Sequence, residues 1–126
     1  MTNFGAGIKH TEHGEQSALF DWALGAQYQY PELALMFAVP NGGARAITTA
    51  RKLKAEGVRA GVPDIFLPAP RGNKHGLFVE LKVGRNRPSE IQQAWIDSLQ
   101  EQDYAVEVCY GFDEAQAAIV KYLEGK

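Results

Sequence analysis

Cysteine is nearly absent from this sequence, and its scarcity excludes several classes of protein. Cys109 is the only cysteine among 126 residues, so no internal disulfide can cross-link the fold. The three histidines do not join it in the spacing of a zinc site. We predict that Cys109 is a small buried residue.

Long hydrophobic runs are missing as well. No stretch approaches the roughly 18 consecutive apolar residues that a membrane helix needs. The N-terminus lacks the basic segment and apolar run of a signal peptide, so a cytoplasmic location is expected. The chain is 45% hydrophobic, enough for one folded domain over residues 1–126, with residues 1–10 expected to form a loose tail.

Positive charge is scarce outside the middle of the chain. The net charge is −2, but residues 45–87, here called the basic block, carry ten Lys and Arg against three acids. The segments before and after the block together hold three basic side chains against twelve acids. Such asymmetry suggests contact with nucleic acid, although a basic block can also be an ordinary solvated surface.

Helical and strand patterns alternate along the chain. Apolar spacing predicts helices over 11–30, 44–56, 89–102 and 113–124, and short apolar runs predict strands over 33–39, 62–68, 76–83 and 104–110. The expected inward residues are Leu19, Trp22, Ala23 and Ala26 on the first helix, Ile91, Trp95 and Leu99 on the third, and Ala117, Val120 and Leu123 on the last. This order predicts an α/β domain with a mixed central sheet flanked by helices.

A hairpin between the second and third predicted strands brings charged residues together. A turn centred near Gly72 places Asp64 opposite Glu80, because each lies eight residues from it. Opposed side chains on an antiparallel pair have Cβ atoms roughly 5 Å apart. Lys82 lies two residues after Glu80 and points to the same face, whereas Val79 and Leu81 point toward the core.

Two carboxylates held face to face repel each other, and a divalent cation between them would remove that repulsion. Carboxylate oxygens are the hard ligands that Mg²⁺ or Mn²⁺ prefers. Lys82 beside such an ion would hold a water molecule or stabilise charge growing on a phosphate, as phosphodiester hydrolysis requires. The alternative is a slipped register, with Glu80 and Lys82 forming an ordinary surface ion pair.

Glu15 falls on the apolar face of the first predicted helix, four residues before Leu19. A carboxylate there is costly to bury without a partner, which suggests that it reaches the metal site or a bound water. The alternative is that Glu15 stays hydrated in the first turn, where negative charge favours the helix dipole.

These residues resemble the VRR-NUC domain, the virus-type replication-repair nuclease module of the PD-(D/E)XK superfamily. The matching runs are Gly61-Val62-Pro63-Asp64 and Phe78-Val79-Glu80-Leu81-Lys82. Further matches are Pro40-Asn41-Gly42-Gly43 before a basic helix and Ser89-Glu90-Ile91-Gln92-Gln93-Ala94-Trp95 after the lysine. The resemblance extends over about residues 12–124.

The resemblance implies a restriction-endonuclease-like core and a DNA endonuclease that depends on Mg²⁺ or Mn²⁺. Asp64 and Glu80 would bind the metal together with the Leu81 backbone carbonyl, with Lys82 as the catalytic lysine. Glu15 would be a further acid at or near the metal, and Gln92 a supporting catalytic residue. Similarity to Holliday-junction resolvases implies a homodimer that acts on branched DNA in repair, in a bacterial or phage-infected cell. The alternative is a non-catalytic DNA-binding module that keeps the fold.

Several of these residues also have structural explanations. Ser89 and Gln92 have the spacing of a capping box, so Gln92 would serve the helix, the site or both. Asn41 would bring backbone close to a phosphate or simply form a turn. Phosphate contacts are expected from basic side chains that are otherwise merely solvated: Arg45, Arg51, Lys52, Arg85 and Arg87.

Overall fold

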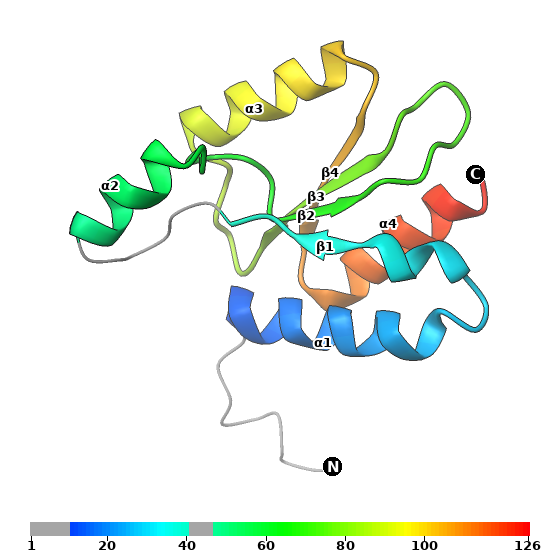
Figure 1. Ribbon diagram of the computed structural model, residues 1–126. Helices are drawn as coiled ribbons and strands as arrows, with labels where there is room; N and C mark the ends of the chain where they lie inside the picture. Colours follow the sequence, from blue (N-terminus) through cyan, green and yellow to red (C-terminus); the bar gives the residue numbers. More distant parts are fainter. Residues whose placement is uncertain (1–10, 41–46) are drawn as a thin grey trace.

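A computed structural model describes residues 11–40 and 47–126, in which a four-stranded sheet lies between helices (Figure 1). The elements in chain order are α1 (Glu12–Ala26), the 3₁₀ helix η2 (Pro31–Leu35), β1 (Phe37–Ala38), α2 (Ile47–Ala55), β2 (Ile65–Leu67), β3 (Leu77–Lys82), α3 (Glu90–Glu101), β4 (Ala105–Tyr110) and α4 (Phe112–Leu123). The expected tail, residues 1–10, lies outside the described residues. No helix within the described ranges is both long and apolar enough to span a membrane.

The sheet is mixed, as the alternation of elements predicted. Its strand order is β1-β2-β3-β4, with antiparallel pairing of β1 to β2 and of β2 to β3, and parallel pairing of β3 to β4. Figure 1 shows α1 and α4 on one side of the sheet and α3 on the other. The α/β fold class is therefore confirmed.

The hydrophobic core lies between the sheet and the two helices α1 and α4. Alternate residues of the hairpin, such as Ile65, Val79 and Leu81, are almost completely buried there. They pack with Leu19 of α1 and Ile119 of α4, which are also fully buried. This face of β3 is the structural face, and the intervening residues point to the opposite face, which is called the site face below.

The hairpin has the register that the turn position predicted. Ile65 pairs with Val79 and Leu67 with Leu77, and continuing this register by one residue sets Asp64 opposite Glu80. The strands are shorter than expected, since β2 begins only after Asp64. Asp64 is nevertheless held at the sheet, because its carbonyl accepts a hydrogen bond from the Val39 amide at 2.7 Å.

The first predicted strand, residues 33–39, is mostly wrong. Pro31 at the start of η2 favours a helical turn, and Leu33 and Met36 are buried three residues apart, a spacing that suits a 3₁₀ helix. Only Phe37 and Ala38 pair with β2.

The inward residues of two helices also differ from the expectation. On α4 the buried stripe is Ala115, Ile119 and Leu123, so Leu123 is confirmed, whereas Ala117 is exposed and Val120 only half-buried. On α3 only Ile96 is buried, and Ile91 is 56% exposed. A helix that covers the margin of a sheet buries a narrower stripe than one packed over its centre.

Gly61 explains how α3 comes close to the loop before Asp64. Its φ of +93° favours glycine, and a Cβ placed there would lie 2.1 Å from Ile91 Cγ2 and 3.1 Å from Trp95 Cδ1. The absence of a side chain thus allows the loop that precedes Asp64 to lie against the helix that carries Gln92.

Candidate functional site

The site face of β3 buries two charged side chains. Glu80 is 1% exposed and Lys82 is 7% exposed, and such residues are rarely buried this deeply unless they are paired. Both alternate with the core residues Val79 and Leu81 along β3, so their side chains point to the opposite face of the sheet. The alternative of a hydrated surface ion pair is therefore wrong for this pair.

The two charges share a third partner on α3. Lys82 Nζ lies 3.3 Å from Glu80 Oε2 and donates a hydrogen bond to Gln92 Oε1 at 2.8 Å. Gln92 Nε2 donates to Glu80 Oε2 at 3.2 Å, which closes a triangle of three side chains. A carboxylate, an ammonium group and an amide thus hold one another in a fixed arrangement.

Gln92 also completes a capping box with Ser89, so it caps the helix and contacts Glu80 and Lys82 at the same time. The Ser89 hydroxyl accepts from the Gln92 amide N–H at 3.2 Å, and the Ser89 amide N–H donates to Gln92 Oε1 at 2.9 Å. Because Oε1 receives this N–H, the NH₂ end of the side-chain amide must face Glu80. The cap of α3 therefore orients a side chain of the site.

The Glu80 carboxylate is only half satisfied. Its Oε2 is paired as described, but Oε1 is buried and has no hydrogen-bond partner among the described residues. Burial, followed by the charge of Asp64, raises the pKa of the Glu80 carboxyl to about 7, against a partial lowering by Lys82. An oxygen buried beside a second carboxylate is well suited to pair with a cation.

Asp64 approaches Glu80 from the neighbouring strand segment. Its Oδ2 accepts a hydrogen bond from the Leu81 amide at 2.8 Å, which fixes the carboxylate against the backbone of β3. The two carboxylates offer the oxygen ligands that Mg²⁺ or Mn²⁺ prefers, so the residues present fit such an ion. No third His, Cys, Asp or Glu joins them in a recognisable metal-binding group within residues 11–40 and 47–126.

Glu15 has a different contact from the one that we expected. Its Oε1 accepts a hydrogen bond at 3.0 Å from the amide of Phe112, the first residue of α4. The residue before it, Gly111, is the N-cap and has no side chain that could accept this bond. Glu15 therefore caps α4 from α1, and its participation in metal binding stays a prediction.

Glu12 is an acidic residue near the site that sequence reasoning missed. It lies in the first turn of α1 together with Glu15, and its charge contributes to raising the pKa of Glu80. The sequence signal that could have identified Glu12 is the pair of acids in the first turn of the helix, of which only Glu15 lies on the apolar face. The Glu12 carboxylate thus adds negative field at the site.

The expected phosphate contacts stay predictions. Asn41 and Arg45 lie outside the described residues. Arg51 and Lys52 are exposed on α2, and Arg85 and Arg87 are exposed on the loop between Lys82 and Ser89. Arg85 and Arg87 follow Lys82, the candidate catalytic lysine, by three and five residues.

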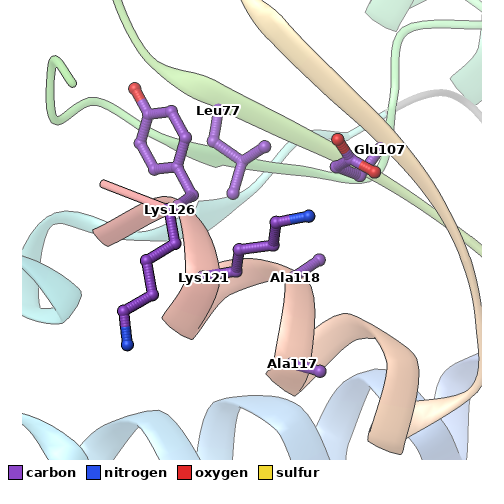
Figure 2. A pocket seen from close by; sticks show the side chains of 7 residues that line it. Leu77, Glu107, Ala117, Ala118, Lys121 and Lys126 are labelled. Atoms are coloured by element: carbon purple, nitrogen blue, oxygen red, sulfur yellow. The ribbon is translucent and has the colours of Figure 1, made fainter. Parts of the chain in front are cut away.

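A hollow of about 370 Å³ lies elsewhere, between α4 and β4 (Figure 2). Lys121 and Ala118 line it from α4, and Glu107 lines it from the strand. Glu107 is the register partner of Val79, a residue of the structural face. The hollow therefore opens on the side of the sheet opposite Glu80 and does not belong to the candidate site.

Comparisons with known proteins agree on one family. A sequence model of the VRR-NUC domain matches residues 8–113. Fanconi-associated nuclease 1 of Danio rerio is 29% identical over 107 residues, which cover 83% of this chain but only 10% of that relative. A solved structure described as a VRR_NUC domain protein is 27% identical with a TM-score of 0.78, over 94% of this chain and 92% of that one.

Proposed function

The chain belongs to the VRR-NUC domain family, and we propose that it is a Mg²⁺- or Mn²⁺-dependent endonuclease that hydrolyses phosphodiester bonds in DNA. The observation that carries the proposal is the buried Glu80 carboxylate, whose Oε1 lacks a partner among the described residues. The name of the Danio rerio relative, Fanconi-associated nuclease 1, supports a nuclease activity.

Asp64 and Glu80 would hold the ion, with the Leu81 carbonyl as the backbone ligand that the resemblance implies. Both carboxylates are fixed before any ion binds, Asp64 by the Leu81 amide and Glu80 by Gln92 and Lys82. A bound divalent ion would polarise a phosphate oxygen and lower the pKa of a bound water.

Lys82 would stabilise negative charge that develops on the phosphate. Its ammonium group has three N–H donors, of which Glu80 and Gln92 engage two among the described contacts. The remaining donor is available to a phosphate oxygen or to a water molecule. Gln92 keeps Lys82 and Glu80 in place and is therefore a positioning residue in this proposal.

The preferred substrate that we propose is branched DNA, bound by a homodimer. This finer proposal rests on the resemblance to junction resolvases and on the basic block at residues 45–87, which includes Lys82. Sedimentation of the protein with and without a four-way junction would test the dimer. A cytoplasmic location remains a prediction.

The test of catalysis uses an end-labelled four-way junction and a duplex of matched sequence. We expect cleavage of the junction in Mg²⁺ or Mn²⁺, no cleavage in chelator, and loss of cleavage by at least a hundredfold in Asp64→Asn. Calorimetric titration with Mn²⁺ should show binding to the wild type and weaker binding to Glu80→Gln. Cleavage in chelator, or full activity of Asp64→Asn, would overturn the proposal.

A further inference from the structure

Tyr110 lies beside Lys82 on the site face, although the two are far apart in the sequence. The parallel pairing of β3 and β4 aligns Leu81 with Cys109 and Lys82 with Tyr110. Leu81 and Cys109 are both buried in the core, so the next pair points to the opposite face. Neighbouring strands are about 4.8 Å apart, which sets the Tyr110 side chain next to the candidate catalytic lysine.

The Tyr110 ring is exposed, but its backbone is firmly held. The residue is 37% exposed at the end of the edge strand β4. Its amide N–H donates to Glu114 Oε1 at 2.9 Å, and the amide of the next residue, Gly111, donates to the Lys82 carbonyl at 3.0 Å. A large aromatic ring is thus presented to solvent from an anchored position.

The other end of the site face is already occupied by aromatic side chains. Phe66 stacks on Phe78 with ring centroids 4.3 Å apart, and Tyr104 packs edge-on against both. Along β3, Phe78 and Lys82 flank Glu80, so the aromatic group closes the hairpin side. A phosphate held at Lys82 would therefore lie toward the Tyr110 end of β3 and away from this aromatic group.

We propose that Tyr110 stacks against an unpaired nucleobase next to the phosphate that lies at Glu80 and Lys82. The inference rests on the proposed function, since it assumes a DNA phosphate at this site. Aromatic side chains stack on bases with little sequence preference. A base inside a duplex has both faces covered by its neighbours, so only an unpaired or terminal base can meet the ring.

The experiment measures binding in chelator, where metal-dependent cleavage cannot occur. Two junction DNAs are compared, one with unpaired nucleotides at the branch point and one with abasic sites at the same positions. Tyr110→Ala is compared with the wild type and with Tyr110→Phe, which keeps the ring. Tyr28→Ala is the matched control, because Tyr28 is 97% exposed and follows the C-terminal end of α1, whereas Glu12, whose charge reaches Glu80, lies at the N-terminal end.

We expect Tyr110→Ala to weaken binding of the base-bearing DNA about tenfold and to leave binding of the abasic DNA unchanged. Tyr110→Phe and Tyr28→Ala should bind both DNAs as the wild type does. Equal loss on both DNAs, or no loss on either, would overturn the inference. Cleavage of the base-bearing DNA by the wild type in Mg²⁺ is measured separately, so failure of the nuclease proposal is distinguishable from failure of stacking.

Discussion

The Glu80 carboxylate combines deep burial, a nearby like charge and an oxygen without a partner among the described residues. Each of these features disfavours the ionised form, and Lys82 offsets them only in part. Removing one partner of a buried charged pair commonly destabilises a protein by several kcal/mol. A cation bound at Oε1 would therefore stabilise the ionised carboxylate. Without such a cation, the stability of the protein should depend on the protonation of Glu80.

The pH dependence of stability has a definite sign. The pKa of Glu80 is about 7 in the folded protein against an ordinary value of 4.5, so between these values the folded state holds a proton that the unfolded state has lost. The contribution of Glu80 to the free energy of unfolding should therefore fall as pH rises through this window and level off above it. Urea unfolding in chelator, at about pH 5 and about pH 7.5, measures the change.

Glu80→Gln should remove most of this dependence, because glutamine does not titrate. Glu107→Gln, which changes an exposed carboxylate on the opposite face, is the control and should behave as the wild type. An unchanged pH dependence in Glu80→Gln would show that other groups cause it.

At the scale of the element, the N-terminus of α3 serves both the helix and the site. The capping box satisfies two backbone N–H groups that would otherwise be unpaired, and it fixes which end of the Gln92 amide faces Glu80. The stability of this helix end and the alignment of Lys82 are consequently coupled.

Ser89→Ala should lower the stability of the protein and its rate of cleavage together. Loss of the hydroxyl acceptor is expected to destabilise the protein by about 1 kcal/mol and to reduce kcat severalfold with little change in KM. Denaturant unfolding and steady-state cleavage measure the two effects. Ser89→Thr keeps the hydroxyl and should restore both. A stability loss with unchanged kcat would mean that the cap does not position Gln92.

At the scale of the whole molecule, the charge distribution matters more than the net charge of −2. Arg85 and Arg87 stand on the exposed loop directly after Lys82, within the basic block. Most acids lie in the segments before and after the block, although the charge of Glu12 reaches Glu80. A negatively charged protein can therefore attract DNA to one region.

Reversing the charge of Arg85 and Arg87 to Glu should weaken DNA binding and make it less dependent on salt. Each lost phosphate contact should reduce the slope of log affinity against log salt by about 1. Fluorescence anisotropy over a salt series measures the slope. Lys121→Glu, in the hollow on the opposite side of the sheet, is the control. If the salt slope falls equally in the Arg85/Arg87 variant and in Lys121→Glu, the DNA does not bind specifically at the loop that carries Arg85 and Arg87.

The sequence by itself determined the features that depend on neighbouring residues. The two faces of β3 follow from a strand period of two, and the hairpin register follows from the turn near Gly72. The cap follows from the spacing of Ser89 and Gln92. The sequence alone therefore predicts that Asp64, Glu80 and Lys82 lie together. The apolar run over 33–39 predicts a strand, but only Phe37 and Ala38 form one, because a short apolar run fits a buried 3₁₀ turn equally well.

Only the tertiary structure decided which distant residues meet. Glu15 contacts Phe112 across 97 positions, and Tyr110 lies beside Lys82 through pairing of two strands that α3 separates in the chain. An amphipathic pattern shows that a helix has a buried face, but hydrophobic burial is non-directional and does not specify the partner. The capping role of Glu15 and the exposed position of Tyr110 therefore depend on how the helices pack on the sheet, and the sequence pattern does not predict them.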